Sequence, residues 1–359
     1  MLTEHRRALH RIPETGWEVG KTSAYVKSVL SALPCEVFSP VGNAVCAYFD
    51  FGKPETVAFR SDMDGLPVTE QTGLPFASER EGFMHACGHD GHMAILLGLA
   101  QKLAEMTDAP RNVLLLFEPA EETTGGARAI CETGVLQKYY VNRIYGLHLW
   151  PGVEKGTVFS REGGLMSRSC EVSVRFTGKS VHIARWIEGK DALFAAVQFI
   201  RAAYERVEGR ENCLLRFGKM VSGEVRNAVS RETALEGSLR CLDDAGYEEM
   251  RRMLSEVAAD VERETGCAVE VRQTAGYPPV TNDLGLLREA KTRFPIKDIA
   301  PTYITEDFSV YQQQVPGVFF FLGTGGTELL HSPRFDFDER LLETGLALFL
   351  ALAAPENEE

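Results

Sequence analysis

The sequence predicts an α/β sandwich domain into which a smaller ferredoxin-like α+β domain is inserted. Three observations lead to this fold class. The chain has 359 residues, which exceeds the usual size of one domain. Strand-like and helix-like segments alternate along residues 1–164, as expected of an α/β domain. A β-α-β-β-α-β order, which is the ferredoxin-like pattern, follows in residues 165–275.

The predicted α/β domain is discontinuous and comprises residues 1–164 and 276–359. Apolar residues have helical spacing along residues 2–33, with a break at Pro13 and Gly16. The other elements expected in this domain are strands at 45–49, 56–60, 112–117, 143–149 and 318–322, and helices at 93–106 and 339–353. The last three strands and the first of these helices are apolar on nearly every side, which predicts burial between layers. The final residues, 355–359, are expected to be disordered.

The inserted domain is predicted to comprise residues 165–275. Residues 169–176 alternate between apolar and polar side chains, which is typical of a strand buried on one face. The elements expected after it are an amphipathic helix at 191–207, strands at 213–217 and 233–241, a second amphipathic helix at 247–265 and a strand at 267–273. A segment of this length can form a core of its own.

The acidic composition of the chain excludes two classes of partner. It has 38 basic and 51 acidic residues, a net charge of −13, whereas nucleic acids and anionic membranes attract clusters of Lys and Arg. No apolar run approaches the roughly 20 residues that span a bilayer. The first residues lack the apolar segment of a secretory signal. We therefore expect a cytoplasmic protein whose eight cysteines are reduced.

Residues 85–92 concentrate side chains that bind metals. The run His85-Ala-Cys87-Gly-His89-Asp-Gly-His92 places one thiol and three imidazoles in eight positions. Thiolates and neutral imidazoles are good ligands for first-row metals. The alternative is a turn whose histidines only form hydrogen bonds, but three of the chain's eight histidines lie here, which favours a metal site. The local spacing leaves open which of the three bind.

Two pairs of carboxylates follow predicted strands. Glu121 and Glu122 come after strand 112–117, where they mark either a solvated helix start or one metal ligand and one base. Neighbouring side chains diverge and can serve different roles, and the Cys/His cluster favours the second interpretation. Asp62 and Asp64 follow strand 56–60, and open α/β sheets bind ligands at such strand ends.

Several isolated polar residues complete the candidate set. His148 and His331 would each be structural if taken alone, but strand ends converge on one edge of a sheet, which favours both as site residues. His182 lies in the inserted domain, where a neutral imidazole could polarise a substrate carbonyl. Asn227 and Arg240 lie there too, and Arg is shaped to hold a carboxylate, although a surface ion pair is the alternative.

Taken in order, these motifs resemble the two-metal exopeptidase and aminoacylase family, and within it the hippurate-hydrolase-like amidohydrolases. The resemblance covers nearly the whole chain. The motifs that carry it are Arg7-Ala-Leu-His10-Arg-Ile-Pro13-Glu14, Arg60-Ser-Asp62-Met-Asp64-Gly-Leu-Pro, Met84-His-Ala-Cys87-Gly-His89-Asp-Gly-His92, Pro119-Ala-Glu121-Glu122 with Gly125-Gly126-Ala, Glu306-Asp307-Phe308 and the His331 segment. The motif around Cys87 is highly specific, and the others are strong as an ordered set.

The resemblance implies two divalent metal ions (Zn, Mn, Co or Ni). The ligands it implies are Cys87, His89, Glu122, His148 and His331, with Cys87 in the bridging place that an Asp fills elsewhere in the family. Glu121 would be the general base that takes a proton from water. One of the two carboxylates Asp62 and Asp64 would orient a metal-bound histidine, and the resemblance leaves open which.

For the inserted domain, the resemblance implies a lid that also forms a homodimer. His182 would stabilise the oxyanion, in its own site or in that of a partner subunit. Asn227 and Arg240 would hold the substrate carboxylate. The loop around His182 departs from the family, because Ser180-Val-His182-Ile-Ala-Arg-Trp stands where Gly-Gly-His-Ala-Ala-x-Pro is common. Phe117-Glu118-Pro also replaces the usual Phe-Gln-Pro.

The activity implied is metal-assisted hydrolysis that removes an N-acetyl or aromatic acyl group from a small N-acyl amino acid. Deacetylation of N-acetyldiaminopimelate is one narrower possibility, and a dipeptidase or carboxypeptidase is the nearest alternative. A non-catalytic zinc-binding protein that holds a ligand is disfavoured, because it would not need Glu121 as a separate base. A metal-free thiol enzyme with Cys87 as nucleophile would not need so many carboxylates and imidazoles.

Overall fold

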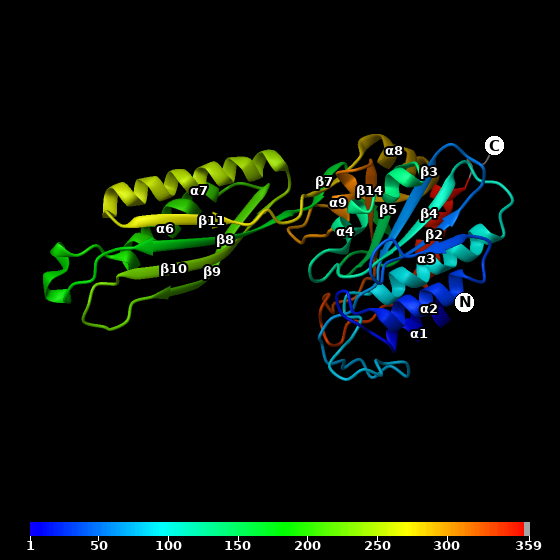
Figure 1. The fold of residues 1–359 in the computed structure, drawn as a ribbon, viewed down its shortest axis with the longest axis horizontal. Helices are drawn as coiled ribbons and strands as arrows, with labels where there is room; N and C mark the ends of the chain where they lie inside the picture. Colours follow the sequence, from blue (N-terminus) through cyan, green and yellow to red (C-terminus); the bar gives the residue numbers. More distant parts are fainter. Residues whose placement is uncertain (355–359) are drawn as a thin grey trace. The chain divides into compact units, whose positions relative to one another are not determined.

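The computed structural model describes residues 1–354, so the predicted disorder of residues 355–359 lies outside the described residues (Figure 1). The chain divides into two compact units. Unit 1 comprises Met1–Leu165, Thr281–Ala300 and Asp307–Glu359, and unit 2 comprises Met166–Val280 and Pro301–Glu306. The assignment of a metal-binding domain and a lid to particular stretches of the chain stays a prediction.

Unit 1 is built on an eight-stranded sheet with the order β1-β2-β4-β3-β5-β14-β6-β13. Its strands are β1 (Glu36–Phe38), β2 (Val45–Phe49), β3 (Thr56–Asp62), β4 (Asn112–Glu118), β5 (Val141–Trp150), β6 (Val158–Ser160), β13 (Ile296–Asp298) and β14 (Gly317–Gly323). Strands β4, β3, β5 and β14 are parallel neighbours. Their carboxyl ends therefore lie along one edge, where open α/β sheets bind ligands.

Helices cover both faces of this sheet. They are α1 (Leu2–His10), α2 (Gly20–Leu30), α3 (His89–Ala104), α4 (Gly126–Glu132), α5 (Val135–Lys138), α8 (Leu284–Arg293), α9 (Phe308–Gln312) and α10 (Leu341–Ala353). Helices α1, α3, α8 and α10 share one apolar core with the sheet, and α4, α5 and α9 pack on the other face (Figure 1). This coverage explains why β4 and β14 are buried along their whole lengths, as their apolar runs predict, and why β5 is buried along most of its length. Strand β3 is also buried throughout.

The central helix α3 begins at His89, four residues earlier than the sequence predicts. Gly88 precedes it with φ of 86°, a conformation that glycine adopts without the steric cost of a Cβ atom. A Cβ atom there would also lie 3.0 Å from Cδ1 of Leu149. The left-handed residue turns the chain sharply into the helix, so that His89 and His92 both belong to its first turn.

Unit 2 is a four-stranded antiparallel sheet with the order β11-β8-β10-β9 and two helices on one face (Figure 1). Its elements are β8 (Arg168–Thr177), the short 3-10 helix η1 (Ile183–Glu188), α6 (Ala192–Val207), β9 (Cys213–Ser222), β10 (Glu232–Cys241), α7 (Asp244–Thr265) and β11 (Ala268–Gln273). Alternate residues of β8 are buried against α6 and α7, as its alternating sequence predicts. The predicted ferredoxin-like order, and with it the predicted fold class, is confirmed.

A two-stranded sheet of β7 (Gly163–Met166) and β12 (Val280–Asn282) lies where the chain passes between the units. Like β1, β6 and β13, these strands are only three or four residues long, and none of the five is predicted from the sequence. None of the helices in the described part of the chain combines the length and apolar character needed to cross a bilayer.

Candidate metal centre

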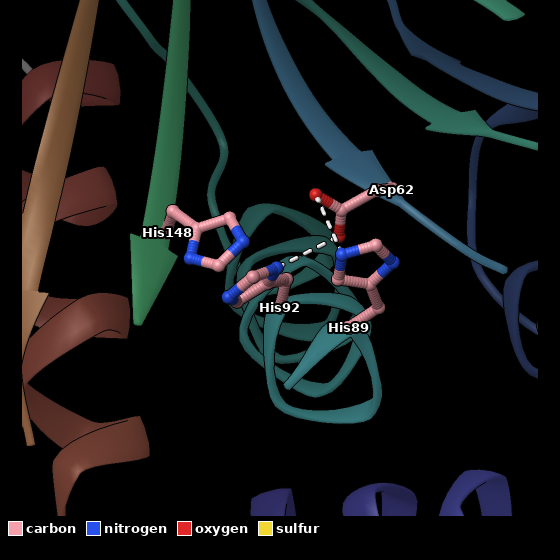
Figure 2. A group of neighbouring side chains, drawn as sticks. All are labelled: Asp62, His89, His92 and His148. Atoms are coloured by element: carbon pink, nitrogen blue, oxygen red, sulfur yellow. Dashed lines mark hydrogen bonds and ion pairs between the residues drawn. The ribbon is translucent and has the colours of Figure 1, made fainter. Parts of the chain in front are cut away.

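The candidate site lies at the carboxyl ends of the parallel strands of unit 1. Strand β3 ends at Asp62, β5 carries His148 near its end, and α3 begins with His89. Figure 2 shows the side chains of these residues, together with His92 from α3, converging on one another. Ligand atoms of the four residues all lie within 4.8 Å of one another. The topology therefore gathers residues that are far apart in sequence.

A second group overlaps the first. Ligand atoms of Cys87, His89 and Glu122 also lie within 4.8 Å of one another. Cys87 Sγ lies 3.3 Å from Nε2 of His148, and Oε1 of Glu122 lies 3.1 Å from Nε2 of His331. The five residues that the family resemblance implies as ligands thus form one continuous cluster, with His89 common to both groups.

The environment of His89 fits a metal ligand. Its side chain is fully buried, and within residues 1–354 neither ring nitrogen has a hydrogen-bond partner. Nε2 lies 3.7 Å from Asp62 Oδ2 and 3.8 Å from Glu122 Oε1. Two ligand atoms that are each about 2.1 Å from one ion are separated by about 3–4 Å. Both distances are too long for hydrogen bonds, and the distance to Glu122, which the resemblance also implies as a ligand, suits two atoms that share a cation.

The tautomer of His148 also suits a ligand. Its Nδ1 lies 2.7 Å from the carbonyl oxygen of Leu149, which can only accept, so the ring proton is on Nδ1. Nε2 then presents a lone pair toward Cys87. Fixing a histidine tautomer through a backbone carbonyl is the usual way in which proteins orient a metal-binding imidazole.

Burial sets the protonation states of the thiol and the imidazoles. It raises the pKa of Cys87 well above its ordinary value, and the charge of Glu122 raises it further. It lowers the pKa of His89 and, more strongly, that of His148. The imidazoles of His89 and His148 are therefore neutral near pH 7, which is the form that binds metals. By contrast, the hydrogen bond to Glu122 raises the pKa of the exposed His331. The thiol keeps its proton until a cation takes its place.

The two aspartates flank His89 from opposite sides. Burial would raise the pKa of Asp62, but His89 and His92 hold it well below its ordinary value. Asp64 lies 3.8 Å from the other ring nitrogen of His89. Burial raises the pKa of Asp64 well above its ordinary value, and the negative charges of Glu122 and Asp62 add to this effect. Such a concentration of buried acidic groups is stabilised by cations.

Asp64 also shapes the turn that carries the adjacent glutamates. Its two carboxylate oxygens accept the backbone N–H groups of Glu121 and Glu122, at 3.1 and 3.3 Å. The residue before them, Ala120, has φ of 66°, which is strained for a residue with a Cβ atom. His331 has φ of 67° as well, and its N–H donates to the carbonyl of Ala86, next to Cys87. Strained backbone at both places is typical of functional sites.

His92 is a site residue for which the sequence alone gave no role. Its Nε2 accepts the N–H of Leu149 at 2.9 Å, so its proton is on Nδ1, which donates to Asp62 at 2.7 Å. Both nitrogens are therefore occupied, and His92 positions Asp62 instead of presenting a lone pair. The sequence contains one signal for this role. His92 follows His89 by three residues, and residues at that spacing share one face of a helix.

Beneath these ligands lies a buried network centred on Arg60. The guanidinium donates to Asp62 at 3.0 Å, to Glu118 at 2.7 Å and to Asp307 at 2.8 Å. Burial raises the pKa of Glu118 well above its ordinary value, since the opposing effect of Arg60 is smaller. Tyr311 also donates its hydroxyl to Glu118, at 3.0 Å. The network ties β3, β4 and the start of α9 together.

The three candidate site residues of unit 2, His182, Asn227 and Arg240, lie in two separate places. The chain at His182 bridges to Ala228, and the N–H of Ile183 donates to the carbonyl of Asn227, so His182 and Asn227 are neighbours, and both are exposed. Arg240 lies at the opposite end of β10, where it donates to Thr305 at 3.4 Å. Ten strand residues span roughly 30 Å. One substrate carboxylate therefore cannot contact both Asn227 and Arg240 of the same chain.

Comparison with known proteins identifies the family of this chain. Residues 58–354 match the model of peptidase family M20/M25/M40. The chain belongs to this family. The prediction of an exopeptidase and aminoacylase relationship is thus confirmed, and so is the prediction that the chain is a hydrolase acting on amide bonds.

Named relatives and a solved structure are similar over nearly the whole chain. A Streptococcus pneumoniae protein named N-acetyldiaminopimelate deacetylase is 37% identical, covering 96% of each chain. A Lactococcus lactis protein of the same name is 34% identical, covering 99% of each. The YXEP protein of Bacillus subtilis, described as a dinuclear metal-binding peptidase of the M20 family, has a TM-score of 0.85 and 30% identity, covering 98% of this chain and 96% of its own.

We expect the replacement His92→Ala to weaken metal binding by about 10–100-fold, because Asp62 loses the group that orients it. His92→Asn is the matched control, since its amide can still donate to Asp62, and we expect a smaller loss. Competition with a chromogenic chelator measures both affinities. Metal binding by His92→Ala as tight as that of the wild type would contradict the positioning role.

Proposed function

We propose that this protein is a metal-dependent amidohydrolase that removes the acetyl group from a small N-acetyl amino acid, with N-acetyldiaminopimelate the first candidate substrate. The observation that carries the proposal is the continuous cluster of metal-binding side chains beside Glu121. A purely structural metal site would not need a second, adjacent glutamate. The names of the full-length relatives support the acetyl group and the diaminopimelate substrate.

We infer that the cluster holds two divalent ions, which Zn, Mn, Co or Ni could supply. The donor set is one thiol, three imidazoles and one carboxylate, contributed by Cys87, His89, Glu122, His148 and His331. Cys87 lies near both His148 and His89, as expected of a ligand shared by two ions. When bound, the ions would lower the pKa of a water molecule and polarise the scissile carbonyl.

In this proposal Glu121 is the general base. A carboxylate oxygen of Glu122 lies near ligand atoms of Cys87 and His89, whereas one of Glu121 lies within 4.8 Å of a carboxylate oxygen of Asp307, so one can serve as a ligand and the other can exchange protons. Asp64 accepts hydrogen bonds from the backbone N–H groups of both residues, which fixes the backbone position from which the Glu121 side chain extends. Glu121 would take a proton from the attacking water and pass it to the leaving amine. The products of the hydrolysis are a free amino acid and acetate.

We further propose that residues of unit 2 recognise the substrate. The imidazole of His182 would stabilise the negative charge that develops on the carbonyl oxygen. Asn227 and Arg240 would bind polar groups of the amino acid, with Arg240 suited to a carboxylate. Because Asn227 and Arg240 lie at opposite ends of β10, contributions from both to one site require two copies of the chain.

Exposed apolar side chains on unit 2 support a homodimer. They are Ile183, Trp186 and Ile187 of η1, Leu193, Phe194 and Val197 of α6, Met220 and Val221 of β9, and Val225 of the loop that follows. Ile187 is 80% exposed, which is unusual for so large an apolar side chain. Strand β9 is also an edge strand, whose unpaired backbone can bind a second copy of itself.

The substrate class is tested by amine release from N-acetyldiaminopimelate, other N-acetyl amino acids, N-benzoyl amino acids and dipeptides. We expect the N-acetyl compounds to be hydrolysed fastest. Chelation should abolish the activity, and Mn²⁺, Zn²⁺ or Co²⁺ should restore it. Faster hydrolysis of dipeptides would indicate a peptidase instead. Bound metal without hydrolysis of any compound would favour a ligand-holding protein.

For the base, we expect Glu121→Gln to keep its metal and to reduce turnover by about 10²-fold or more, because general base catalysis is lost. Glu122→Gln is the matched control at the neighbouring position, and it should lose metal affinity. Turnover and metal content are measured on the same preparations. Turnover of Glu121→Gln at the wild-type rate would show that another group takes the proton.

For the homodimer, we expect the double variant Phe194→Glu and Val221→Glu to be a monomer, because it would bury two charges in the interface. Leu284→Glu changes an exposed apolar residue of unit 1 and is the control, which should remain dimeric. Light scattering after size-exclusion chromatography gives the mass of each. A monomeric wild type would contradict the proposal.

A further inference from the structure

Two cysteines of unit 2 face each other directly across neighbouring strands. Cys213 is the first residue of β9 and Cys241 is the last residue of β10, and they are partners in the antiparallel register. Both belong to the apolar core beneath α6 and α7, so their side chains lie on the same face of the sheet. Neither residue has a part in the proposed amide hydrolysis.

The register places the two residues at a distance that a disulfide can span. Directly opposed residues in antiparallel strands have Cα atoms about 4.5 or 5.5 Å apart, depending on the type of pair. Disulfides join Cα atoms that are about 4.4–6.8 Å apart. Either type of pair therefore meets the requirement. The neighbouring Cys170 of β8 is instead opposite Leu239 and has no cysteine as its direct partner.

The two thiols also differ in a way that suits oxidation. The interaction between the two thiols lowers the pKa of Cys213 and raises that of Cys241. Cys213 is only 3% exposed, but it lines a surface hollow of about 530 Å³ together with Arg210 and Arg216. Arg210 also lowers the pKa of Cys213, while burial and the charges of Asp243 and Glu249 oppose this effect, and the thiolate is the reactive form of cysteine. A small oxidant can reach Cys213 through this hollow, whereas Cys241 is fully buried.

A shared metal ion is the other use of neighbouring thiols, and the geometry does not support it. The groups of described residues that could hold a metal ion all lie elsewhere and include neither cysteine. Within residues 1–354, no third thiol, imidazole or carboxylate joins the pair in a group that could hold a common ion.

We propose that Cys213 and Cys241 are a redox pair that forms a reversible disulfide when the protein meets a hydroperoxide. The thiolate of Cys213 attacks the peroxide O–O bond and becomes a sulfenic acid, and the other oxygen leaves as water or an alcohol. The sulfur of Cys241 then attacks the Cys213 sulfur and releases water. The two thiols lose two electrons and two protons in total, and the hydroperoxide is reduced.

The disulfide joins the edge strand β9 to the interior strand β10 at the end opposite their connecting loop. It closes a loop around the whole β9–β10 hairpin and restricts the unfolded chain, which raises stability. Strand β9 carries two of the exposed apolar residues, Met220 and Val221. Oxidation would therefore stiffen a strand that is proposed to contact a second copy of the chain. The redox pair itself does not depend on the proposed function.

The test is a graded treatment of the whole protein with hydrogen peroxide, followed by alkylation of the remaining thiols under denaturing conditions and peptide mapping. We expect a peptide that links Cys213 to Cys241, which dithiothreitol removes. The half-buried Cys35 and Cys131 are internal references in the same digest. The proposal is overturned if both paired cysteines are recovered as alkylated thiols after the references have been oxidised. It is also overturned if Cys213 is linked to Cys170.

Variants give a second readout. Oxidation should raise the unfolding temperature of the wild type and of the control Cys170→Ser, and dithiothreitol should reverse the increase. Cys213→Ser and Cys241→Ser should show no such increase. An equal increase in Cys213→Ser would mean that another site is responsible. If a variant does not fold, peptide mapping of the wild-type protein still tests whether Cys213 and Cys241 form a disulfide.

Discussion

The burial of many ionisable groups at one edge of a parallel sheet is the constraint on which the structure of unit 1 depends. Asp62, Asp64 and His89 are almost completely shielded from water, and Glu122 lies beside them. Carboxylates in such a place are costly unless positive charge compensates them. Arg60 supplies part of that charge from below. Within residues 1–354 neither ring nitrogen of His89 has a hydrogen-bond partner, which suits the proposed cations as the source of the rest.

The surrounding backbone makes this concentration of charge geometrically possible. Gly88 turns the chain into α3 so that Cys87 and His89 are presented together. Ala120 and His331 adopt left-handed conformations on two other segments. The conformations of Ala120 and His331 cost stability locally, and the apolar core shared by the sheet, α3 and α10 offsets the cost. The core therefore fixes the backbone that presents the proposed ligands, which preserves their mutual distances.

Patterns in the sequence predicted much of this arrangement, but not its details. Apolar runs gave the central strands because those strands are covered on both faces, and the density of ligands near Cys87 pointed to a metal site. The three-residue strands carry too few residues for a periodic signal. The pairing of His92 with Asp62 depends on the contact between β3 and α3, which no local pattern encodes. The opposition of Cys213 and Cys241 likewise depends on strand register.

Anomalous X-ray scattering from crystals grown with Zn²⁺ or Mn²⁺ tests the two-metal centre most directly. The proposed centre predicts two peaks in unit 1, one beside His148 and one beside His331, with Cys87 and His89 adjacent to them. Data collected on both sides of the absorption edge identify the peaks as the added metal. A single peak, or peaks away from these residues, would contradict the proposed centre.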